Sequence, residues 1–210
     1  MSNIYFIMME IISVIGTIAF TLSGFLVGVR KQLDWLGVLV LALLTAIGGG
    51  MIRDVMVSRL PVVFADNTSL IAIMATLFVI KTLLHLDLKA RRLRAGLFLL
   101  ADSIGLVAFS ITGAQVGLLL ELNLFGVILL GFVTAVGGGM VRDVLVNDIP
   151  VILHQDFYGS IAVLVSLSLY LLDTIGWLNA MTMNMVFIGG LTVRFLAYRY
   201  HLALPKINMP

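Results

Sequence analysis

The sequence contains no cysteine and few charged residues. None of its 210 residues is Cys, only 11% are Asp, Glu, Lys or Arg, and 61% are hydrophobic. The absence of cysteine excludes disulfides, thiol catalysis, Cys-ligated zinc and iron–sulfur clusters. An ordinary soluble domain is about 25% charged and about 45–50% apolar. Because its mean hydropathy is +1.15, we expect the chain to be an integral membrane protein without a sizeable aqueous domain.

Seven apolar stretches predict membrane-spanning helices. A spanning helix takes about 20 residues, and each stretch is bounded by charged or turn-forming residues. We therefore expect an all-α integral membrane protein with a single transmembrane domain over residues 1–210. The predicted spans are 5–28, 35–58, 68–86, 95–119, 124–147, 157–173 and 180–198.

The distribution of Lys and Arg predicts the orientation of these spans. Cytoplasmic loops carry an excess of basic residues, and only Arg59 lies near an outer loop if the N-terminus is outside. An odd number of spans also places the two termini on opposite sides. We expect a bacterial or archaeal inner membrane, with the N-terminus outside and the C-terminus cytoplasmic. The basic residues on the cytoplasmic side are then Arg30, Lys31, Lys89, Arg91, Arg92, Arg94, Arg199 and Lys206.

An internal repeat is the strongest pattern in the chain. Residues 19–64 align without a gap to residues 108–153, and 21 of the 46 positions are identical. Three consecutive glycines, an Arg-Asp pair and a proline match in register, which apolar bias alone does not produce. Each copy holds three predicted spans, in about 5–86 and about 95–173, and the span at about 180–198 is additional. Because three is odd, the copies are inverted around a pseudo-two-fold axis in the membrane plane.

A glycine triplet lies inside one predicted span of each copy. Each glycine costs a helix interior about 1 kcal/mol relative to alanine, so three in a row should kink or unwind the helix. Exposed backbone at that depth requires other protein or a water-filled cavity. We expect the two broken helices to pair near the midplane and line a cavity; close packing without a pore is the alternative. The triplets are Gly48, Gly49 and Gly50 in span 35–58, and Gly137, Gly138 and Gly139 in span 124–147.

An Arg-Asp pair follows each triplet, Arg53 with Asp54 and Arg142 with Asp143. Charged residues within a membrane are costly and usually face a bundle interior or a pathway. We expect each pair to begin the second half of a broken helix, where a carboxylate meets free amides. The pairs either line an ion pathway or form salt bridges across the axis, Arg53 to Asp143 and Arg142 to Asp54. Both are true if the pairs form a gate.

Other polar residues within the spans are less symmetric. Two threonines, each three residues before a triplet, offer their hydroxyls either to an ion or to their own helix. Two acidic residues are second-rank candidates for a cation route. Lys81 and Arg194 are expected to extend to the cytoplasmic interface. The second-rank pathway residues are Thr45, Thr134, Asp102 and Glu10.

With seven predicted spans, an inverted repeat and the sequences GGGMIRDV and GGGMVRDV, the chain resembles the prokaryotic trimeric intracellular cation (TRIC) channel family. The same bacterial proteins are also grouped under a glycine-transporter domain. The resemblance covers nearly the whole chain. It implies a homotrimer with an hourglass pore in every subunit, constricted at the kinked triplet helices, and permeability to K⁺ and other monovalent cations.

Two functional hypotheses follow. In a cation channel, carbonyls of the triplets would bind K⁺ transiently, Asp54 and Asp143 would favour cations, and Arg53 and Arg142 would limit the flow. The sequence has no Thr-Val-Gly-Tyr-Gly filter, so strong K⁺ selectivity is not expected. The alternative is a transporter of glycine or another amino acid, because inverted repeats with broken helices are common in secondary transporters. We expect no enzyme activity, cofactor, tightly bound metal or nucleic-acid partner; membrane lipids are the expected surroundings.

Overall fold

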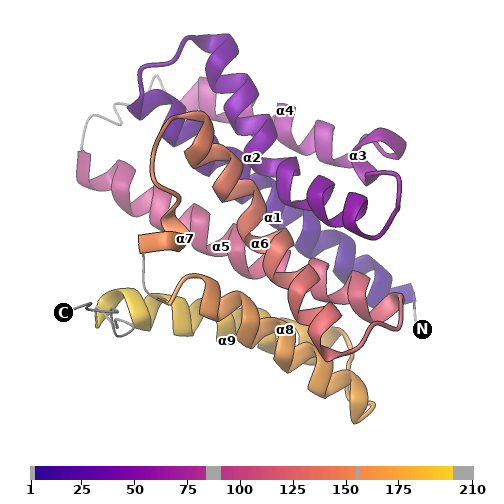
Figure 1. Cartoon of the computed structure of the whole chain (residues 1–210). Helices are drawn as coiled ribbons and strands as arrows, with labels where there is room; N and C mark the ends of the chain where they lie inside the picture. The colour runs from indigo at the N-terminus through magenta and orange to yellow at the C-terminus, as the bar shows by residue number, and fades with distance from the viewer. Residues whose placement is uncertain (1–2, 84–90, 155–156, 201–210) are drawn as a thin grey trace, which may run out of the picture.

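The computed structural model describes residues 3–83, 91–154 and 157–200, and these form a bundle of α-helices (Figure 1). The predicted all-α fold is confirmed. Lys89 and Lys206, which entered the orientation argument, lie outside the described residues. The described helices are α1 (Asn3–Arg30), α2 (Trp35–Met56), α3 (Val62–Ala65), α4 (Thr68–Leu83), α5 (Arg91–Leu119), α6 (Leu124–Leu145), α7 (Val151–His154), α8 (Gly159–Thr174) and α9 (Ala180–Arg199).

Five of these helices, α1, α2, α5, α6 and α9, are long and apolar enough to cross a membrane. The shorter apolar helices α4 and α8 match the predicted spans 68–86 and 157–173, the last three positions of the former lying outside the described residues. The four-residue helices α3 and α7 were not predicted. Each follows a proline of the repeat, Pro61 or Pro150. Proline is tolerated there because the first turn of a helix leaves its amides without intrahelical partners.

The helices of the two repeats occupy equivalent places. Helix α4 packs against α1 and α2, and α8 packs against α5 and α6. Helices α1, α2, α5 and α6 lie between them, as Figure 1 shows. Helix α9 has no counterpart in the first repeat and packs mainly against α8 and α5. The fold is therefore a two-fold arrangement with one extra helix on the side of the second repeat.

The two triplet helices, α2 and α6, cross in direct backbone contact. A Cβ atom on Gly49 would overlap the carbonyl oxygen of Thr134, and one on Gly138 would overlap the carbonyl oxygen of Thr45. Thr45 of α2 thus faces Gly138 of α6, and Gly49 of α2 faces Thr134 of α6. Because the residue numbers rise along α2 while those of their partners fall along α6, the two helices run antiparallel. The same contact occurs twice with the repeats exchanged, as a two-fold relation requires. The predicted pairing of these helices is confirmed.

A second reciprocal contact joins α1 and α5. Gly16 lies against the ring of Phe109, and Gly105 lies against the ring of Phe20. The two rings meet edge to face, with centroids 5.2 Å apart. Residues that are equivalent in the two repeats touch each other only where the axis passes between them. The Phe20–Phe109 pair therefore marks the axis.

Neither triplet interrupts its helix. Helix α2 is continuous from Trp35 to Met56, and α6 is continuous from Leu124 to Leu145. The prediction that each triplet unwinds its helix, with the Arg-Asp pair beginning a second half-helix, is wrong; a kink within a continuous helix, the other predicted form, stays a prediction. The physical reason is the crossing itself, because the missing side chains let two backbones pack closely. In this conformation the triplet carbonyls remain in helical hydrogen bonds.

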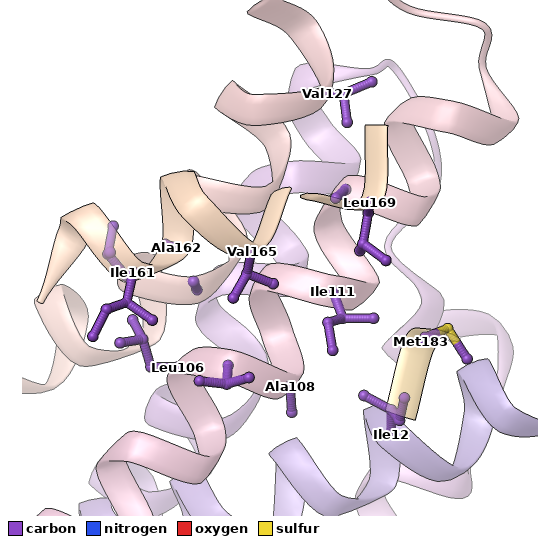
Figure 2. Close-up of a cluster of buried hydrophobic side chains, with 14 of the residues drawn as sticks. Ile12, Leu106, Ala108, Ile111, Val127, Ile161, Ala162, Val165, Leu169 and Met183 are labelled. Carbon is purple, nitrogen blue, oxygen red and sulfur yellow. The ribbon is translucent and has the colours of Figure 1, made fainter. Parts of the chain in front are cut away.

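The largest hydrophobic cluster lies on the side of the second repeat. It joins α1, α5, α6, α8 and α9 through fully buried aliphatic side chains (Figure 2). The clusters around α1, α2 and α4 are smaller. The second repeat is thus the more solidly packed of the two. Members labelled in Figure 2 include Ile12, Leu106, Ile111, Val127, Ile161, Val165, Leu169 and Met183.

The crossing predicts unequal effects for neighbouring glycines. Gly49→Ala should lower the free energy of unfolding by about 1–3 kcal/mol, because the methyl group overlaps a backbone carbonyl that cannot turn aside. The control is Gly50→Ala, whose Cβ meets only the end of the Arg53 side chain, at 3.8 Å. It should be neutral or stabilising by up to about 1 kcal/mol. Unfolding of the purified variants in detergent measures both; equal losses would contradict the close crossing.

Candidate functional site

Each Arg-Asp pair lies near the end of its own helix and is closed within its own repeat. The Nε of Arg53 donates to Oδ1 of Asp54 at 2.9 Å, and the Nε of Arg142 donates to Oδ1 of Asp143 at 2.8 Å. The predicted alternative, salt bridges across the axis, is therefore wrong. Each arginine lies four residues beyond its middle glycine, about 6 Å along the helix. Because the helices are antiparallel, the two pairs lie on opposite sides of the crossing.

The aspartates also fix the short helices that follow. The Oδ2 of Asp54 accepts from the backbone N–H of Val62 at 3.1 Å, and the Oδ2 of Asp143 accepts from that of Val151 at 2.9 Å. These amides are the first of α3 and α7. A carboxylate is stabilising beside free amides at a helix start. The expected environment of the aspartates is thus present, but a different helix provides it.

The pair of the first repeat borders a cavity of about 390 Å³. The cavity lies where α1, α2 and α5 meet the α3 segment. Three carboxylates and two guanidinium groups line it, so its walls carry a net negative charge. Four predicted site residues, one of them second-rank, meet here. The charged lining residues and the triplet glycine are Glu10, Gly50, Arg53, Asp54, Arg59 and Asp66.

The pair of the second repeat is sealed inside the protein. The side chain of Arg142 is 0% exposed. Its Nη1 donates to Oδ1 of Asp102 at 2.5 Å and to the hydroxyl of Ser23. Its guanidinium also lies over the ring of Phe98, 4.9 Å from the centroid. Asp102, predicted only as a second-rank pathway residue, is therefore the interhelical ion-pair partner of Arg142.

Two further residues close this site, and neither was predicted to belong to it. The hydroxyl of Tyr158 would lie 3.3 Å from a Cβ on Gly139, and the Arg142 guanidinium would lie 3.7 Å from it. The guanidinium of Arg194 lies 4.9 Å from the centroid of the Tyr158 ring. Arg194 is only 2% exposed, so the prediction that it extends to the interface is wrong. Its place near the end of the span did not reveal that its side chain faces Tyr158.

The remaining second-rank residues do not face the cavity with their polar groups. The hydroxyls of Thr45 and Thr134 donate to the carbonyls of Leu41 and Leu130 in their own helices, both at 2.6 Å. Both threonines are fully buried. Their part in the site is through the backbone carbonyls that touch the middle glycines.

An exposed ion cluster joins the loops on the side of the second pair. Asp148 accepts from Lys31 at 2.6 Å and from Arg30 at 3.0 Å. The hydrogen bond from Lys31, together with the charge of both cations, lowers the pKa of Asp148. A lowered pKa means that the cluster stabilises the fold at neutral pH and that this contribution is lost as the pH falls through the lowered pKa.

The sequence matches a known family over both repeats. A family model described as "Glycine transporter" matches residues 10–85 and 99–174. The chain is 33% identical over 202 residues to the inner membrane protein YadS of Escherichia coli strain K12, which covers 94% of this chain and 95% of YadS. It is also 33% identical over 200 residues to the membrane protein YvgT of Bacillus subtilis, and that alignment covers 94% of this chain and 95% of YvgT.

The fold matches solved structures of the same kind. A prokaryotic TRIC channel crystallised in 0.5 M KCl superposes with a TM-score of 0.84 and 30% identity, covering 95% of this chain and 100% of that one. The TRIC orthologue from Rhodobacter sphaeroides superposes with a TM-score of 0.83 and 28% identity, and the match covers 92% of this chain and 98% of the orthologue. The duplicated Arg-Asp motif, the helix arrangement and these matches agree. The chain therefore belongs to the prokaryotic TRIC channel family, a family of multi-pass membrane proteins rather than enzymes.

Proposed function

We propose that the protein is a monovalent-cation channel, permeable to K⁺, with one pathway in each subunit of a homotrimer. The cavity beside Arg53 and Asp54 is the observation that carries the proposal. Its net negative lining raises the local concentration of cations at the entrance. The solved relatives are described as TRIC cation channels, and the Rhodobacter sphaeroides orthologue is described as trimeric, which agrees with this assignment.

In this proposal the cavity is one mouth of the pathway and the crossing of α2 and α6 is its constriction. The backbone contact of Gly49 and Gly138 leaves no room for an ion between the helices. Conduction then requires α2 and α6 to kink at the triplets, where helix propensity is lowest. Kinking would free carbonyls of Gly48–Gly50 and Gly137–Gly139 to bind K⁺ transiently and weakly.

Planar bilayers test the channel directly. Purified protein should give discrete single-channel currents whose reversal potential follows the K⁺ gradient. Modest preference for K⁺ over Na⁺ is expected, because no dedicated filter sequence is present. The competing function is transport of glycine or a related amino acid, since the cavity offers both guanidinium and carboxylate groups. Absence of currents together with saturable glycine counterflow in liposomes would overturn the channel in favour of the transporter.

We further propose that the cavity opens to the outside of the cell and that Arg142 lies toward the cytoplasm. This follows from an outer N-terminus, because the cavity lies at the start of α1 and the end of α2.

Cysteine labelling of whole cells tests this orientation, because the native chain has no cysteine. Leu33→Cys in the α1–α2 loop should react with an impermeant maleimide only after permeabilisation. Leu120→Cys in the α5–α6 loop should react in intact cells. The native side chains at these positions are 39% and 40% exposed, which makes them a matched pair. The reverse pattern would invert the orientation.

A further inference from the structure

The cavity beside Arg53 is larger than a small inorganic ion needs. Its volume is about 390 Å³, and pockets that bind small organic molecules have volumes of roughly 300–1,000 Å³. An ion with a few waters would fill only part of this space, since one water takes about 30 Å³ in the liquid. The cavity therefore has room for a ligand with a hydrocarbon body.

The deep walls of the cavity are mainly apolar. Two hydroxyl groups among them already donate within their own helices, Thr17 to the carbonyl of Ser13 at 3.0 Å and Thr112 to that of Phe109 at 3.3 Å. Apolar surface gains free energy from contact with hydrocarbon, whereas a polar or charged group placed against it loses hydration. The apolar residues of these walls include Val14, Ala46, Ile47, Phe109 and Val116.

The buried carboxylate of the cavity is already paired through both of its oxygens. Asp54 is 1% exposed. Its Oδ1 accepts from Nε of Arg53 at 2.9 Å and lies 2.8 Å from the Nη2 atom, and its Oδ2 accepts from the N–H of Val62 at 3.1 Å. The charges of this pair thus compensate each other inside the cavity.

The remaining charge lies at the rim. Glu10, Arg59 and Asp66 line the cavity and are all exposed, so the rim carries one net negative charge. Hydrogen bonds from Thr68 lower the pKa of Asp66 and keep its carboxylate ionised at neutral pH. The cavity therefore combines an anionic rim with an apolar interior.

We propose that this cavity binds an amphiphilic organic monocation, an alkylammonium whose charged group lies at the carboxylates of the rim and whose hydrocarbon chain enters the apolar interior. The inference deepens the proposed function and rests on it only for the effect on current, because the same cavity is the mouth of the pathway. Binding itself does not depend on conduction.

Protection of a cysteine from labelling tests the site. Ser69→Cys places the reporter at the half-buried wall of the cavity, in a chain that otherwise has no cysteine. Leu33→Cys is the control, because this exposed position lies in the loop at the opposite end of α1 from Glu10. Each purified variant is reconstituted into liposomes and treated with a neutral maleimide, and intact mass gives the labelled fraction. The probe is n-hexyltrimethylammonium, which has no amine that reacts with the maleimide.

The probe should slow labelling at 69 by at least about tenfold at saturation and leave labelling at 33 unchanged. Shorter homologues should need about three- to fourfold more for half-protection for each methylene lost, because each methylene in the cavity contributes apolar burial. Neutral n-hexanol should protect far more weakly, and glycine should not protect. Equal protection by hexanol would contradict the role of the rim charge, and protection by glycine alone would overturn the ligand class in favour of a zwitterion.

Rim variants test the electrostatic part with opposite expected signs. Glu10→Gln combined with Asp66→Asn should raise the half-protecting concentration by about fivefold or more, and asparagine keeps a good helix cap at position 66. Arg59→Gln should lower it, because the rim becomes more negative. All three positions are exposed, so the variants should fold. The same half-protecting concentration in every variant would overturn the proposed place of the ammonium group.

The outcomes separate this site from the channel. In planar bilayers the probe should also reduce K⁺ currents. Currents that the probe does not reduce, together with unprotected labelling at 69, would overturn the site and leave the channel in place. Protection at 69 in a protein that gives no currents would support the site and contradict the channel.

Discussion

The antiparallel crossing of α2 and α6 is the contact on which the rest of the structure depends. Gly49 and Gly138 have no side chains, so each backbone meets a threonine carbonyl of the other helix. That approach fixes the two helices at a short separation and determines where their ends lie. Arg53 and Arg142 are consequently carried to opposite sides of the crossing. Each aspartate then binds the first amide of the short helix that follows, which sets the return path of the chain.

If the two repeats were strictly symmetric, both Arg-Asp pairs would border a cavity or both would be buried. The sequence breaks the symmetry at a few positions, of which Asp102 and Tyr158 are the clearest, and α9 packs mainly against α8 and α5 of the second repeat. The ion pair of Arg142 with Asp102 does not imply a large gain in stability, because desolvation offsets much of the attraction between buried charges. Its physical effect is to restrict Arg142 to one position.

The sequence predicted the features that depend on local composition or on register. Hydropathy located the seven apolar helices, and the repeat identified α2 and α6 as partners. The continuous helix through each triplet was not predictable from glycine propensity, because the compensating contact comes from another helix. The burial of Arg194 was missed for a related reason, since depth along a span does not reveal which face of the helix meets protein. Tyr158 lay outside any motif and outside the aligned repeat segments 19–64 and 108–153.

The central claim is that cations enter a pathway within each subunit through the cavity of the first repeat and, in the conformation described, do not reach the buried site of Arg142. Anomalous diffraction from crystals grown with Tl⁺ in place of K⁺ tests it most directly. The account predicts anomalous density in the cavity, near the carboxylates of Glu10 and Asp54, in every subunit, and none between Arg142 and Gly139. Density confined to an axis between subunits, with the cavities empty, would contradict it.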